Sequence, residues 1–351
     1  MSTTRSDGRA SNMHDVARAA GVSHQTVSRV LNGSPHVAGS TRARVEAAIA
    51  DLDYRPNPLA RALILNRTQL IGVIAPHSLE YGPATKLESI EVTASQNGYD
   101  TVIVPTDIRT PDGIRTGIER LARLAVDGAI MILPFHHAVQ TLRDITVPVP
   151  YVAVLSEDGR EHTTGTIGLS PASTVPDEGP ALVVRHLISL GHRRILHIAG
   201  PESWTAAESR LEGYRLAMRQ AGLQPLESLR GDWSAKLGYE LGMVALGDDT
   251  VTAIFAANDQ TALGVLQAAD EVGLSVPDDI SVVGYDDVPE AGYYHPPLTT
   301  VRKDNESVGQ RAVHDLISSI TGGQSGATIS PSPGQLVVRA STAPARQRRP
   351  S

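Results

Sequence analysis

The stretch DVARAAGVSHQTVSRVLNG (residues 15–33) carries polar side chains that could form hydrogen bonds with another molecule. Its first residues predict a short helix, and Gly21 ends it because glycine enters a left-handed turn without steric cost. Ser23 can cap a second helix by accepting from N–H groups left unpaired in its first turn. Two short helices joined by a tight turn, with a polar outer face on the second helix, are typical of a DNA-reading helix-turn-helix. An ordinary helical hairpin has the same pattern.

Two further helices would have to position this pair. The helix expected over about 40–52 has apolar residues at i, i+3, i+4 and i+7 spacing and completes a small three-helix core. Pro56 and Pro58 stop it, and residues 59–65 can form only two more helical turns. Such a short helix is unstable alone, so we expect it to fold only when DNA or a partner copy holds it. A plain linker is the alternative.

From residue 69 onward, short apolar stretches alternate with amphipathic ones, which is typical of parallel sheets with helices on both faces. The predicted strands are 70–75, 101–104, 129–133, 151–154, 195–199, 251–255 and 280–284, with a strand-like stretch in 335–340. The predicted helices are 84–97, 112–125, 178–190, 207–221, 235–246 and 260–272. This length exceeds one ordinary doubly wound domain, so we expect two lobes. Binding sites in such sheets lie at the carboxyl ends of the strands.

Composition narrows the class of protein. The 351 residues include no cysteine, which excludes disulfides and zinc fingers. No stretch approaches the roughly 20 apolar residues of a membrane span, and the N-terminus lacks the apolar core of a secretory signal. We therefore expect a cytoplasmic protein without a membrane partner.

The charge of the chain is distributed unevenly. Residues 1–68 hold nine arginines against five acidic residues, whereas the remainder holds 22 basic and 33 acidic residues. A basic head on an acidic body suggests that only the head binds a polyanion.

The chain resembles the lactose-repressor (LacI/GalR) family of bacterial transcription regulators over about residues 12–342. The matching segments keep the family's order and are DVAxxAGVSxxTVSRVLNG (15–33), TRARVEAAIADLDYRPNPLARAL (41–63), IGV (71–73), HLISLGHRRI (186–195), RLEGY (210–214), AANDQTALG (256–264), PDDISVVGYDD (277–287) and HPPLTTV (295–301). The resemblance implies an all-α helix-turn-helix head and an α/β two-lobed core similar to periplasmic binding proteins.

The resemblance also implies domain boundaries. These are a disordered tail (1–11), the helix-turn-helix domain (12–57), a hinge helix and linker (58–68), an effector-binding and dimerisation core (69–342) and a second tail (343–351). The first lobe of the core would hold about 69–168 with 302–322, and the second about 169–301 with 335–340.

For the head, the resemblance implies that His24, Gln25 and Arg29 read base edges, as arginine can pair with guanine and glutamine with adenine. Phosphate or mixed contacts are assigned to Ser23, Thr26, Ser28, Asn32 and His36. In the hinge, Asn57 would lie near the DNA backbone, and Ala60 and Leu63 match the family pattern. Leu63 would wedge between base steps from the minor groove or pack against its symmetry mate. Ala38 and Gly39 stand where the family offers a hydroxyl cap, so Ser40 is expected to cap the third helix.

For the core, the resemblance implies that Arg210, Trp233, Asn258 and Asp286 bind an effector. Their chemistry fits a sugar, because a carboxylate accepts paired hydroxyls, arginine and asparagine donate, and tryptophan offers an apolar face to a pyranose ring. The GDWS context of Trp233 resembles galactoside-binding members, which makes a β-galactoside one hypothesis. Ala153 weakens it, since those members carry an aspartate there, and other mono- or disaccharides remain open.

The resemblance implies a homodimer on operator DNA, with Leu263, Tyr293 and Tyr294 as candidate dimer contacts. The absence of a leucine heptad after residue 322 argues against a tetramer. We expect no cofactor, no metal ion and no catalytic residue, because no phosphate-binding glycine loop, GxSxG motif or metal-ligand cluster is present. Two alternatives are a sugar-binding protein without a DNA role and a corepressor-type family member that responds to a non-sugar ligand.

Overall fold

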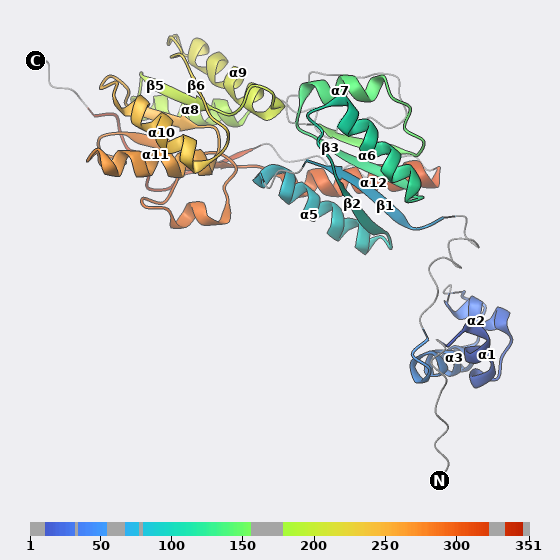
Figure 1. Cartoon of the computed structure of the whole chain (residues 1–351). Coiled ribbons are helices and arrows are strands. Elements are labelled where there is room, and N and C mark those ends of the chain that lie inside the picture. The colour runs from blue at the N-terminus through green and yellow to red at the C-terminus, as the bar shows by residue number, and fades with distance from the viewer. Residues whose placement is uncertain are drawn as a thin grey trace, which may run out of the picture. The chain divides into compact units, whose positions relative to one another are not determined.

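The computed structural model describes residues 11–31, 34–54, 67–76, 80–155, 178–322 and 334–346. The chain forms two compact units, residues 1–68 and 69–351 (Figure 1). Within the described ranges, no helix is long and apolar enough to cross a membrane.

The described part of the first unit contains three helices packed around one core. Its helices are α1 (Met13–Ala20), α2 (His24–Leu31) and α3 (Gly39–Asp51). Each helix contributes at least one apolar side chain to a shared core, in which Val16, Val27 and Val45 are fully buried. A core this small holds the two helices of the predicted helix-turn-helix against α3.

The ends of these helices follow local chemistry. Gly21 ends α1 in the left-handed region at φ 63°, as the sequence predicts. Ser23 Oγ accepts a hydrogen bond from the Thr26 N–H at 3.2 Å, so the predicted cap of α2 is confirmed. The expectation for α3 is wrong, because the helix begins at Gly39 after Ala38, which has no capping group, rather than at a cap provided by Ser40.

The first lobe of the second unit is a parallel sheet with helices on both faces. Its strands, in the spatial order β2-β1-β3-β4, are β1 (Leu70–Ala75), β2 (Asp100–Pro105), β3 (Gly128–Leu133) and β4 (Tyr151–Leu155). One face packs on α5 (Tyr81–Gln96) and α12 (Asn305–Thr321), and the other on α6 (Pro111–Arg123) and α7 (His136–Arg143). Because successive strand residues point to opposite faces, β1 serves both cores.

The second lobe repeats this architecture. Its parallel strands, in the order β6-β5-β7-β8, are β5 (Ile195–Ala199), β6 (Leu229–Arg230), β7 (Ala253–Ala256) and β8 (Ser281–Val283). The helices α8 (Gly179–Ser189) and α9 (Thr205–Gln220) cover one face, and α10 (Ala235–Leu246) and α11 (Asp259–Glu271) the other. The short helix η1 (Pro289–Tyr293) precedes β9 (Thr300–Arg302), which pairs antiparallel with β10 (Gln335–Val337).

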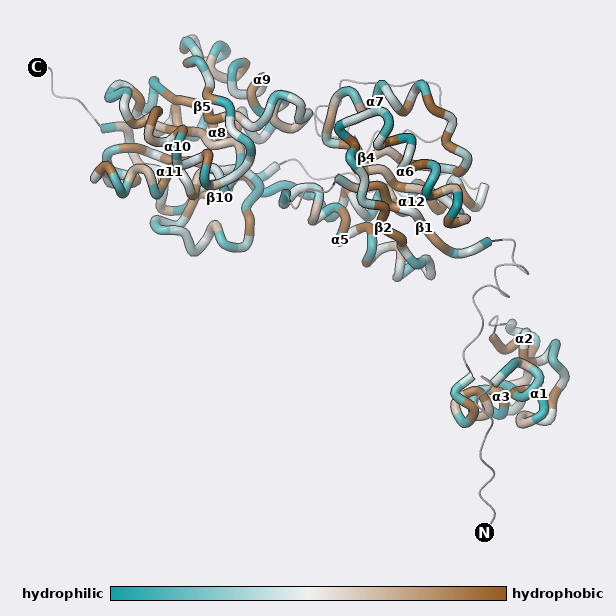
Figure 2. The backbone as a smooth tube through the Cα atoms, viewed as in Figure 1, coloured by the Kyte–Doolittle hydropathy of each residue, from teal (hydrophilic) through white to brown (hydrophobic). Residues whose placement is uncertain are grey.

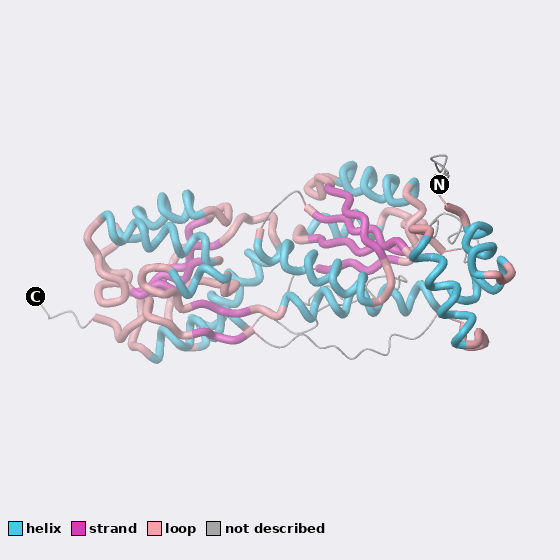
Figure 3. The backbone as a smooth tube through the Cα atoms, turned by 90° about the horizontal axis from the view of Figure 1, so that it is seen from below, coloured by secondary structure: helices cyan, strands magenta, loops and turns pink. Residues whose placement is uncertain are grey.

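Helices flank the strands of each lobe (Figure 3), and the most hydrophobic segments lie inside (Figure 2). The alternating pattern predicts most elements, and the predicted bounds of β1, β5 and α10 match the structure. The strand expected from Val251 begins at Ala253 instead, because the N–H of Val251 closes a turn onto the carbonyl of Asp248. The sequence pattern predicts neither α7 nor β6; a strand of two residues, such as β6, shows no periodicity.

Candidate functional site

The helix α2 presents the predicted base-reading side chains to solvent. His24, Gln25 and Arg29 are exposed, whereas Val27 and Val30 are buried. The major groove of B-DNA admits an α-helix, and amide and guanidinium groups can pair bidentately with bases there. This outer face therefore has the geometry and the chemistry that base contacts require.

Smaller polar groups adjoin α2. Ser23 Oγ lies 2.9 Å from Thr26 Oγ1, His36 is exposed, and Ser28 is half-buried. The hydroxyls of Ser23 and Thr26 thus lie at the start of the helix, where they suit phosphate contacts. The remaining predicted DNA contacts, and the hinge over 58–65 with them, lie outside the described residues: Asn32, Asn57, Ala60 and Leu63.

The second unit contains a pocket lined by residues of both lobes. All four residues predicted to bind an effector line it. The second lobe contributes Trp204, Arg210, Trp233, Asn258 and Asp286, and the first lobe contributes Glu80, Tyr81, Lys86, Ile132 and Pro134 among others. Asn258 and Asp286 follow the carboxyl ends of β7 and β8, where ligands bind in parallel sheets.

Arg210 and Asp286 form a buried ion pair in the pocket wall. Arg210 Nη2 donates to Asp286 Oδ1 at 2.8 Å, and the two side chains are 6% and 10% exposed. Arg210 Nη1 also donates to the carbonyl of Ala257. The guanidinium carbon lies 4.0 Å from the ring centre of Tyr285 and 5.5 Å from that of Trp233, within cation–π range. The pair therefore presents charge to a ligand without an uncompensated buried ion.

The backbone around the pocket is held in an unusual conformation. Trp233 has φ 74° and Asp286 φ 101°, values that cost a residue other than glycine about 1–3 kcal/mol and that cluster at functional sites. Asn258 supports Trp233, because its Nδ2 donates to the Trp233 carbonyl at 3.0 Å while its Oδ1 accepts from the Thr261 N–H and caps α11. A Cβ at Gly200 would lie 2.5 Å from the indole, so only glycine leaves room for that ring.

Trp233 also offers a donor. Its indole Nε1 is buried and has no hydrogen-bond partner among the described residues, although the side chain lines the pocket. Buried polar groups are normally paired, so this N–H is a candidate donor to a ligand bound in the pocket.

The sequence pattern does not predict the other residues that line the pocket, among them Trp204, Glu80 and Tyr81. Trp204 packs edge-on against Trp233, with 5.6 Å between the ring centres, and against Phe135 of the first lobe, with 5.2 Å between the ring centres. Its scarcity was the available signal, because the chain has only two tryptophans. Glu80 and Tyr81 carried no such signal, since the approach of one lobe to the other places them at the pocket.

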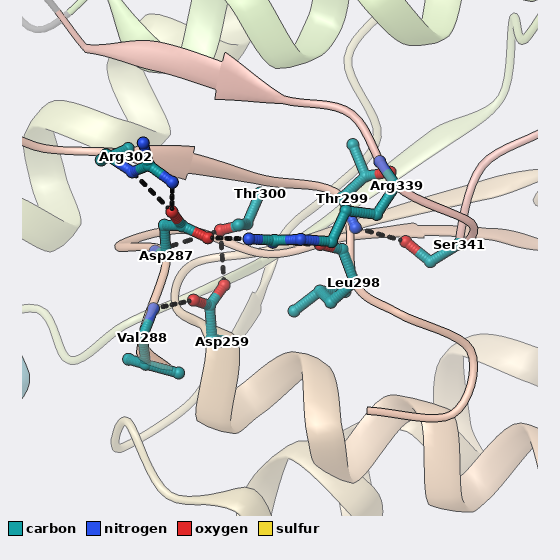
Figure 4. A network of polar contacts seen from close by, with 9 residues as sticks. All are labelled: Asp259, Asp287, Val288, Leu298, Thr299, Thr300, Arg302, Arg339 and Ser341. Atoms are coloured by element: carbon teal, nitrogen blue, oxygen red, sulfur yellow. Dashed lines mark hydrogen bonds and ion pairs between the residues drawn. The ribbon is translucent and has the colours of Figure 1, made fainter. Parts of the chain in front are cut away.

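A polar network next to the pocket fixes the loop that carries the pocket aspartate (Figure 4). Asp287 accepts from Arg302 Nε at 2.7 Å and from Arg339 Nη2 at 2.6 Å. Asp259, at the start of α11, accepts from the hydroxyl of Thr300. The network thereby ties the chain after β8 to β9 and to the segment that follows β10.

Asp259 gives this network a pH dependence. Burial, and then the nearby carboxylates of Asp286 and Asp287, raise the pKa of Asp259 from its ordinary 3.8 to about 7. Because the native state then binds the proton more tightly, the stability contributed by protonated Asp259 is lost as pH rises toward 7. We expect the melting temperature of Asp259→Asn, relative to wild type, to increase from pH 5 to pH 8. Thermal unfolding would measure this, with Glu271→Gln as an exposed control; a difference independent of pH would contradict it.

Comparisons with known proteins agree with this geometry. Residues 12–57 match the model of bacterial regulatory proteins of the lacI family, and residues 184–342 match a periplasmic binding protein-like domain. The lactose operon repressor of Escherichia coli K12 is 36% identical over 87% of this chain and 83% of its own length. The ribose operon repressor of the same organism is 36% identical over 88% and 93%. The crystal structure of the lac repressor dimer bound to operator and the anti-inducer ONPF has a TM-score of 0.80 at 34% identity and covers 95% of this chain and all of its own.

Proposed function

We infer that a small carbohydrate controls operator binding by this chain, which belongs to the lacI family of bacterial regulatory proteins and is a DNA-binding transcriptional repressor. Its relatives are repressors, which confirms the expectation of a regulator rather than an enzyme. The family match over 12–57 and the exposed polar face of α2 argue against a sugar-binding protein without a DNA role.

The observation that carries the carbohydrate proposal is the meeting of Arg210, Trp233, Asn258 and Asp286 in one pocket. A pyranose ring has an apolar C–H face and a rim of hydroxyls. The indole of Trp233 suits the first, and the paired carboxylate and guanidinium suit the second. The buried indole N–H of Trp233 adds a donor for a hydrogen bond to a sugar oxygen.

The kind of sugar is open within this class. The two repressors compared above are named for the lactose and ribose operons, a disaccharide and a monosaccharide. A β-galactoside remains one hypothesis. Ala153 is fully buried in the core of the first lobe and supplies no polar group, so this chain must hold its sugar by other contacts.

We propose the following switch. A cytoplasmic homodimer binds a near-palindromic operator, with α2 of each copy in a major groove and the two hinges over 58–65 in the minor groove between them. Leu263, 40% exposed, and Tyr293, 90% exposed, are candidate dimer contacts together with Tyr294. Sugar bound between the lobes favours a core geometry that separates the hinges. Sugar and operator must then weaken each other reciprocally, typically by about 1–3 kcal/mol.

A ligand screen tests the class of effector. Lactose, galactose, cellobiose or ribose at saturation should raise the melting temperature of the full chain, because binding to the folded state stabilises it. The same sugar should weaken the retardation of a bound genomic DNA fragment in a gel. Stabilisation by adenine or guanine, without any by sugars, would show that the effector is not a carbohydrate. A sugar that strengthens DNA binding would make the chain a corepressor-type member.

A further inference from the structure

Two carboxylates face the pocket from opposite lobes. Asp286 belongs to the second lobe, and Glu80 reaches the pocket from the first lobe, directly before α5. The side chain of Glu80 does not cap α5, although it stands at the N-cap position of that helix.

Both carboxylates line the same pocket. Burial, and then the charges of Asp286 and Asp232, raise the pKa of Glu80. Asp286 is compensated by Arg210 at 2.8 Å. Negative charge on Glu80 thus lies across the pocket from an ion pair, and a ligand between the lobes can contact both.

The described residues that line the pocket carry balanced charge. Glu80 and Asp286 are acidic, and Lys86 and Arg210 are basic. A site without net charge favours neither a sugar phosphate nor an ammonium group, because either would add an uncompensated charge to a partly enclosed space. It suits an uncharged ligand rich in hydroxyl donors, since a carboxylate is an acceptor only.

We propose that Glu80 is a ligand contact of the first lobe and selects an uncharged sugar by accepting a hydrogen bond from a sugar hydroxyl, opposite Asp286. This inference rests on the proposed carbohydrate effector. A sugar held by Glu80 and Asp286 joins the two lobes, so its affinity depends on their separation. That dependence links recognition of one hydroxyl group to the geometry of the core.

Isothermal calorimetry on the full chain tests the proposal. Wild type is first titrated with lactose, cellobiose, galactose and ribose, and with glucosamine and glucose 6-phosphate as charged probes at pH 6.5. The tightest neutral sugar is then titrated into Glu80→Gln and into Glu119→Gln, an exposed glutamate on α6 of the same lobe. We expect Glu80→Gln to bind about 10- to 100-fold more weakly, the range for hydrogen bonds to charged groups, and Glu119→Gln to bind as wild type does.

Deoxy analogues of the bound sugar then locate the contact. Removing one particular hydroxyl should weaken binding to wild type but cost Glu80→Gln much less, whereas removing the others should affect both proteins equally. Equal affinity of Glu80→Gln and wild type, or equal losses for every deoxy analogue, would overturn the role of Glu80 and leave the carbohydrate effector intact. Preferred binding of glucosamine or glucose 6-phosphate would overturn the selection of a neutral sugar. If wild type binds none of the sugars, the proposed function itself fails.

Discussion

Replacing Arg210 by alanine should abolish sugar binding and cost the core about 3–5 kcal/mol of its free energy of unfolding, the usual penalty for breaking a buried ion pair. The substitution leaves the carboxylate of Asp286, 10% exposed, without its cation, and it removes a donor from the carbonyl of Ala257. It also removes the cation that stacks on Tyr285. Chemical denaturation measures the stability, and calorimetry with the sugar identified by the ligand screen measures binding.

Two further variants separate the loss of binding from the loss of stability. Arg215→Ala, an exposed arginine on the same helix, should change neither quantity. The double variant Arg210→Met with Asp286→Asn removes both charges, and asparagine tolerates the positive φ at that position. It should recover much of the stability but not the affinity for sugar. A double variant that still binds sugar as wild type does would show that the ion pair is structural only.

Much of the fold follows from local pattern. Runs such as LIGVIA and ILHIA are long enough, and apolar enough, to define β1 and β5 to the residue. Prediction fails where the deciding contact is not local. The strand β6 is two residues long and exists because Leu229 and Arg230 pair with β5. The helix α3 begins at Gly39 rather than at a cap on Ser40, so the preference of serine for caps did not decide where it starts.

The pocket residues also fall into those that local pattern predicts and those that depend on distant contacts. Asp286 and Asn258 come after apolar strands, and the rule for carboxyl ends places them correctly at one edge of a sheet. Glu80 and Trp204 depend on how the lobes meet. The N–H of Thr205 bonds to the carbonyl of Pro134 across the two lobes, and no residue near Glu80 in the sequence reports that contact. The sequence therefore predicts most of the polar residues that the second lobe contributes to the pocket, and none of the described residues that the first lobe contributes.

Replacing Arg29 by alanine should weaken binding to the operator sequence by about 5- to 150-fold and remove the preference for one base pair, because a bidentate arginine–guanine contact discriminates by about 1–3 kcal/mol. Arg29 is exposed on α2, so its loss should leave the three-helix core, with Val27 and Val30 buried behind it, intact. Selection from random DNA supplies the operator for wild type, and the same selection on the variant shows which position is relaxed.

Arg44→Ala on α3 is the matched control, since it removes the same charge from an exposed helix position of the same unit. A lost phosphate contact weakens binding to all sequences alike and lowers the salt dependence, whereas a lost base contact changes the ratio of specific to non-specific affinity. The two arginine variants should therefore differ in that ratio even where their operator affinities are similar. If Arg29→Ala and Arg44→Ala lower specific and non-specific binding by the same factor, then α2 does not read bases through Arg29, and Gln25 and His24 must supply the specificity.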